Sequence, residues 1–144
     1  MQHQEFTALK WFRRLIALGF VVNMLFALPS LLAPRLLEGV LDVGATNTPY
    51  WLRNVGILLV IISTMYIPVI RAPFRYLFVT YLAVAGRFAA GLLFLLGVLY
   101  MDFPDGMITL SANDLILSLL QATLLFFTLR AGDPRSGQRP SRAL

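Results

Sequence analysis

Long apolar stretches, separated by short polar turns, occupy most of this chain. A membrane-spanning helix needs roughly 20 consecutive residues that are mostly apolar. Four stretches reach that length, at about residues 12–33, 50–70, 74–100 and 107–129. The pattern predicts an all-α fold, an integral membrane four-helix bundle built by residues 1–130.

Two prolines near the end of the first stretch predict a break in that helix. Proline lacks a backbone N–H, so Pro29 and Pro34 should end or kink the first span, and Pro34 can open a new short helix over residues 34–44. One face of this segment carries only apolar side chains: Leu36, Leu37, Val40 and Leu41. We expect a short interfacial helix after the first span, either on the membrane surface or folded back into the bundle.

The composition supports a membrane protein and excludes several kinds of site. The chain is 58% hydrophobic and 13% charged, whereas soluble domains are about 25% charged. It has no cysteine, and its one histidine, His3, lies in the N-terminal segment. No disulfide, thiolate metal site or bis-histidine centre can therefore be built from one copy, and we expect no metal site.

The charges divide between the two ends of the predicted spans. With four spans both termini lie on one side, and most of the cations fall there: Lys10, Arg13, Arg14, Arg71, Arg75, Arg130, Arg135, Arg139 and Arg142. The positive-inside rule then predicts a multi-pass protein of the bacterial inner (cytoplasmic) membrane, with N- and C-termini cytoplasmic. Residues 131–144 should form a disordered basic cytoplasmic tail. A cleaved signal peptide is the competing interpretation of the first apolar run.

Five polar side chains fall near the bilayer midplane when depth is counted at about 1.5 Å per residue: Asn23, Ser63, Thr64, Arg87 and Gln121. Four of them, Arg87, Asn23, Thr64 and Gln121, are the ligand-binding candidates. A charge at this depth is costly and usually faces the protein interior or water. The guanidinium group could hold a quinone carbonyl or a lipid phosphate, or it could belong to a structural polar network. No carboxylate is expected at the depth of Arg87.

A second polar layer is expected nearer the outer surface. Arg53 and Asp114 have opposite charges and similar estimated depths, so they are predicted to form a structural ion pair. In the alternative, Asp114 caps its helix together with Ser111, and Arg53 extends toward the lipid headgroups.

Enzyme chemistry has little support in the sequence. The chain has no Ser-His-Asp set, no H-E-x-x-H motif and no glycine-rich phosphate loop. We therefore name no catalytic residue, and no cofactor other than a bound quinone or lipid. The net charge of +5 follows from the topology, so it is not taken as evidence for nucleic-acid binding.

Three segments carry a resemblance to a known group. Y-W-L-R-N-V-G from Tyr50, Y-I-P-V-I-R-A-P-F-R-Y from Tyr66 and A-V-A-G-R-F from Ala83 resemble small bacterial four-span membrane proteins of the DoxX-like group. The resemblance implies a four-helix bundle that acts as a membrane subunit, in some relatives beside quinone-linked redox proteins. It implies no catalytic residue. The positions that match are Trp51, Arg53, Gly56, Arg71, Pro73, Arg75 and Arg87.

Three classes of function remain open from the sequence. The leading one is a non-catalytic subunit, or a bundle that binds a hydrophobic ligand (quinone or lipid), in a membrane complex. The alternatives are a small oligomeric transporter or permease-like unit and a membrane enzyme that acts on a lipid or quinone. The expected partners are membrane lipids, together with a partner membrane subunit or a homo-oligomer.

Overall fold

The protein is built from helices, four stretches of which are long and apolar enough to cross a membrane. The computed structural model describes residues 2–42 and 50–130, and side chains from Thr7 onward. Its helices are, in order, α1 (Gln2–Leu32), α2 (Pro34–Leu41), α3 (Tyr50–Thr64), α4 (Tyr66–Arg71), α5 (Leu77–Tyr100) and α6 (Met107–Arg130). The candidate spans are Thr7–Leu32, Tyr50–Arg71, Leu77–Tyr100 and Met107–Arg130. The predicted fold class is confirmed, whereas the predicted tail at 131–144 lies outside the described residues.

Prolines decide where two of the helical segments begin and end. Pro34 occupies the first turn of α2, where the missing N–H costs nothing. The second span is divided at Met65 into α3 and α4. Pro68 cannot donate to the carbonyl of Thr64, which accounts for the end of α3 at that residue. Pro29 does not end its helix, since α1 continues to Leu32.

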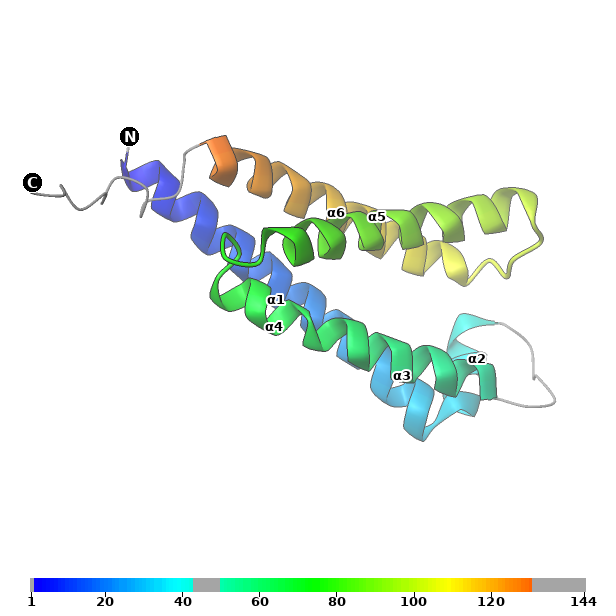
Figure 1. Ribbon diagram of the computed structural model, residues 1–144. Coiled ribbons are helices and arrows are strands. Elements are labelled where there is room, and N and C mark those ends of the chain that lie inside the picture. The colour runs from blue at the N-terminus through cyan, green and yellow to red at the C-terminus, as the bar shows by residue number, and fades with distance from the viewer. Residues whose placement is uncertain (1, 43–49, 131–144) are drawn as a thin grey trace, which may run out of the picture.

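The helices form two arms that share α1. Helices α5 and α6 make one antiparallel hairpin, while α3 and α4 pack on α1, which also contacts α6. Figure 1 shows the arms close together near the chain termini and diverging toward the end that holds α2. Two apolar clusters match this shape: Phe12, Ile16, Tyr66 and Val69 lie near the termini, and a cluster around Leu52 lies at the other end.

Helix α2 folds back against the bundle, which answers the question that the sequence left open. Leu37 and Leu41 are buried in the cluster with Leu52. Leu36 and Val40 are 64% and 71% exposed, so the four predicted apolar residues do not share one buried face. The buried stripe continues instead through Glu38, which is 3% exposed and bonds Arg35 at 3.2 Å. Residues 37, 41 and 38 cover an arc of about 100° on the helix, and residues 36 and 40 lie about 130° around the helix from the middle of that arc.

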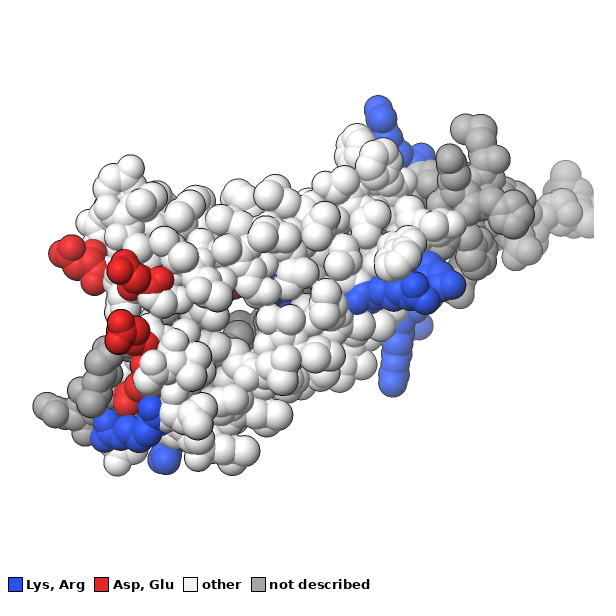
Figure 2. Space-filling view, turned by 180° about the vertical axis from the view of Figure 1, so that it is seen from behind, with Lys and Arg blue, Asp and Glu red and all other residues white. Residues whose placement is uncertain are grey.

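The described charges gather at opposite ends of the molecule (Figure 2). The acidic groups at the α2 end are Glu38, Asp42, Asp102 and Asp105, and Arg35 and Arg53 lie at this end as well. Most described cations lie at the end of the termini: Lys10, Arg13, Arg14, Arg71, Arg75 and Arg130. This separation is the one that the order of spans predicts.

A close contact at Gly91 sets the register of the hairpin between α5 and α6. A Cβ atom at Gly91 would lie 3.0 Å from the backbone nitrogen of Leu115 and 3.1 Å from Cβ of Asp114. The Ser111 hydroxyl donates a hydrogen bond to the Gly91 carbonyl at 2.7 Å. Small residues allow helices to approach this closely in lipid. Gly91 on α5 therefore lies beside Asp114 on α6, at the same height along the hairpin.

This contact predicts that Gly91→Val destabilises the protein, whereas Gly86→Val on the same helix does not. A side chain at Gly91 must displace the α6 backbone, and overpacking of this kind costs about 1–3 kcal/mol. Gly86 has no neighbour within 4 Å of an added Cβ. Thermal unfolding in detergent would measure both variants, and equal melting temperatures would contradict the close contact.

Candidate functional site

A buried ion pair joins the two helices of the hairpin. Nη1 of Arg87 lies 2.6 Å from Oδ1 of Asp114, and their side chains are 2% and 19% exposed. Nη2 of Arg87 donates to the Gly19 carbonyl at 3.1 Å and to Oδ1 of Asn23 at 2.7 Å. Arg87 thus connects α5 with both α6 and α1, deep in the candidate spans.

Further polar contacts extend this network to the second arm. The amide of Asn23 donates to the Ser63 hydroxyl on α3 at 3.1 Å. The guanidinium carbon of Arg87 lies 5.8 Å from the ring centre of Tyr66, within reach of a cation–π attraction. Asn23 therefore links the ion pair to α3, and the ring of Tyr66 links it to α4.

Gly19 lets the network close against α1. A Cβ atom there would lie 3.1 Å from Nη2 of Arg87 and 3.2 Å from Nε2 of Gln121. Gln121 itself donates to the Leu15 carbonyl at 3.1 Å. The backbone of α1 can therefore accept hydrogen bonds from α5 and α6 because residue 19 has no side chain.

The predicted pair between Arg53 and Asp114 is wrong, because Asp114 pairs with Arg87. Arg53 is exposed on α3, which packs on α1 rather than on α6. The expectation that no carboxylate matches Arg87 is also wrong. The hairpin register places Asp114 opposite Gly91, four residues or about 6 Å along the helix from Arg87, and an arginine side chain spans that difference.

The structure brings three of the four ligand-binding candidates together. Arg87 contacts Asn23 directly, and Nε2 of Gln121 lies against the same face of Gly19 as Nη2 of Arg87. Thr64 is exposed, and its hydroxyl donates to the carbonyl of Ile61 in its own helix at 2.6 Å. The neighbouring serine, Ser63, faces α1 instead, because successive residues of a helix point about 100° apart.

The suggested capping role of Asp114 is also wrong. Helix α6 begins at Met107, so Ser111 and Asp114 lie inside it rather than at its start. The Ser111 hydroxyl bonds the carbonyl of Gly91 on α5. Both residues of the S-x-x-D pattern therefore make contacts with the neighbouring helix. A local sequence motif does not distinguish such residues from a helix cap.

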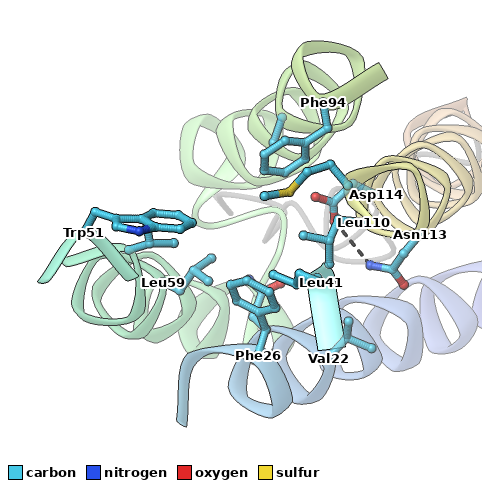
Figure 3. A pocket seen from close by; sticks show the side chains of 13 residues that line it. Val22, Phe26, Leu41, Trp51, Leu59, Phe94, Leu110, Asn113 and Asp114 are labelled. Atoms are coloured by element: carbon cyan, nitrogen blue, oxygen red, sulfur yellow. Dashed lines mark hydrogen bonds between the residues drawn. The ribbon is translucent and has the colours of Figure 1, made fainter. Parts of the chain in front are cut away.

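A cavity of about 200 Å³ lies beside the ion pair, between the diverging arms. Its walls are mainly apolar and come from all four spans and from α2; Phe26, Trp51, Phe94 and Leu110 are among them (Figure 3). Figure 2 shows the molecule hollowed between its two arms.

The polar groups of the cavity are few. They are the side chains of Asn23, Asn113 and Asp114, together with the indole N–H of Trp51. The Asn113 amide donates to Oδ1 of Asp114 at 3.3 Å, and the carboxylate of Asp114 points into the cavity (Figure 3). The part of the ion pair that a molecule in the cavity would meet is therefore the carboxylate, while Arg87 lies behind it.

No protein-family model, curated protein or solved structure that was compared with this chain matches it. The resemblance to the DoxX-like group therefore stays a prediction.

The buried pair predicts a characteristic result in a double-mutant cycle. Arg87→Met and Asp114→Leu should each lower the free energy of unfolding by about 3–5 kcal/mol, because each leaves a buried charge without its partner. The apolar double variant Arg87→Met/Asp114→Leu should recover roughly half of that loss or more, since it removes both charges.

Thermal or chemical unfolding in detergent would measure this cycle. Arg53→Ala is the control and should change stability by no more than about 0.5 kcal/mol, because Arg53 is exposed. If the losses at Arg87 and Asp114 simply add in the double variant, the two side chains are not coupled.

Proposed function

We propose that this four-span membrane protein binds a small hydrophobic molecule in the cavity between its arms. The observation that carries the proposal is an apolar, partly aromatic cavity that has a carboxylate at one side. Ligand sites of proteins share this design, in which apolar walls hold the molecule and a few polar groups orient it. We propose a binding function without catalysis, because no pair of acid and base groups lines the described cavity.

The size of the cavity supports a ligand larger than water. An apolar cavity of about 150 Å³ in another protein stays dry and binds benzene, and this one measures about 200 Å³. An ionisable residue at membrane depth is itself a reason to suspect a functional site. Here Arg87 and Asp114 stand next to the cavity rather than elsewhere in the bundle.

The resemblance of residues 50–88 to DoxX-like proteins is the reason to propose that the chain serves as a subunit of a membrane complex. A small transporter unit is the second candidate. It is favoured by the arms that converge at one end and diverge at the other (Figure 1), since opening at alternate ends around a central site is how many transporters work.

The binding proposal predicts that filling the cavity removes the ligand. Ala90 lines the cavity, whereas the adjacent Ala89 is exposed on the outside of the same helix. Native mass spectrometry of protein released gently from its own membrane should show a bound hydrophobic molecule in wild type and Ala89→Phe. The Ala90→Phe variant should lack it. A bare chain in wild type, or equal retention by both variants, would contradict the proposal.

We also propose the orientation that the charge distribution favours, with both termini in the cytoplasm of the bacterial inner membrane. The chain has no cysteine, so the labelling of a single introduced cysteine reports the exposure of that position. Met101 and Tyr76 are neutral, exposed residues next to opposite ends of α5. With an impermeant maleimide on spheroplasts, Met101→Cys should react directly, and Tyr76→Cys only after permeabilisation. The reverse result would show that the protein has the opposite orientation in the membrane.

A further inference from the structure

Only one of the two carboxylate oxygens of Asp114 accepts hydrogen bonds from the described residues. Its Oδ1 atom accepts hydrogen bonds from Arg87 at 2.6 Å and from Asn113 at 3.3 Å. Within residues 7–42 and 50–130, no hydrogen bond is made to Oδ2. An ionised carboxylate accepts hydrogen bonds and donates none. A molecule seated against Asp114 is therefore recognised by a donor of its own.

The charge balance of the ion pair favours a neutral donor. Arg87 already neutralises Asp114, so a cation in the cavity would add a charge without a partner at membrane depth. An anion would meet the carboxylate first. It would not reach Arg87, which does not line the cavity and already donates hydrogen bonds to Asp114, Gly19 and Asn23.

The walls favour an aromatic ring. Phe26, Trp51 and Phe94 lie around the cavity (Figure 3), and aromatic groups gain from edge-to-face and offset contacts with one another. A volume of about 200 Å³ accommodates a single ring with small substituents. A longer apolar tail would have to leave through the opening between the arms.

We infer that the cavity binds a neutral phenol-type molecule, whose hydroxyl group donates a hydrogen bond to Asp114 while its ring lies among Phe26, Trp51 and Phe94. This inference rests on the proposed function and narrows the class of ligand. It separates the two forms of a quinone, because the oxidised form offers only acceptors to the carboxylate and the reduced form offers hydroxyl groups. It also disfavours the anionic lipid headgroup that Arg87 by itself suggests.

Two probe molecules of nearly equal shape test how much the ligand's hydroxyl group contributes to binding. They leave the protein's ion pair unaltered. In 4-bromophenol a hydroxyl stands where 4-bromotoluene has a methyl group, and bromine quenches tryptophan fluorescence on contact. The chain has two tryptophans, so Trp11→Phe leaves Trp51 as the reporter at the cavity. In nanodiscs at equal concentrations in the bilayer, bromophenol should quench Trp51 saturably with an affinity roughly tenfold or more above that of bromotoluene.

Two variants in the Trp11→Phe background locate the binding. Ala90→Phe should abolish saturable quenching, and Ala89→Phe should retain it. Equal affinities for the two probes, both lost in Ala90→Phe, would overturn the role of the hydroxyl while supporting a hydrophobic ligand in the cavity. Quenching that Ala90→Phe leaves unchanged, or no saturable quenching by either probe, would overturn this inference and contradict the proposed function for ligands of this size.

Discussion

The ion pair between Arg87 and Asp114 limits how the spans can be arranged, because a charge inside a bilayer needs its partners on neighbouring helices. Removing an ion from water costs several kcal/mol even after relaxation, and only good geometry with additional hydrogen bonds offsets that cost. Arg87 meets this condition with contacts to α6 and to the α1 backbone. Each contact requires a helix at a particular distance and rotation, so the pair holds three helices at once.

Two glycines make this arrangement sterically feasible. Gly91 brings α5 and α6 together at the level of Asp114, and Gly19 admits the Arg87 guanidinium to the α1 backbone. The helices therefore meet at the ion pair and toward the termini. Beyond it the arms diverge, and α2 folds back at the open end. The cavity lies in that divergence, which explains why its polar side is the carboxylate of Asp114.

The same geometry changes what the site can recognise. An isolated arginine at midplane would attract anions and hydrogen-bond acceptors. Once Asp114 neutralises it and stands in front of it, the surface that remains open is a hydrogen-bond acceptor beside aromatic side chains. A membrane protein can in this way present a polar group at depth without exposing a net charge to lipid. The character of the site thus depends on which partner faces the cavity.

The sequence by itself determined the class of fold, the four spans, the separation of charges between the two ends and the similar depth of Arg87, Asn23 and Gln121 in the spans. These properties depend on composition and on position along the chain, since about 20 apolar residues span a bilayer and each helical residue advances about 1.5 Å. Only the tertiary structure decided that Arg87 rather than Arg53 pairs with Asp114, that Ser63 rather than Thr64 joins the network, and that Glu38 is buried. Those outcomes depend on the rotation of each helix, on the register set at Gly91, and on which helices are neighbours. A position along one helix carries none of that information, because the same residue can face lipid, a partner helix or a cavity.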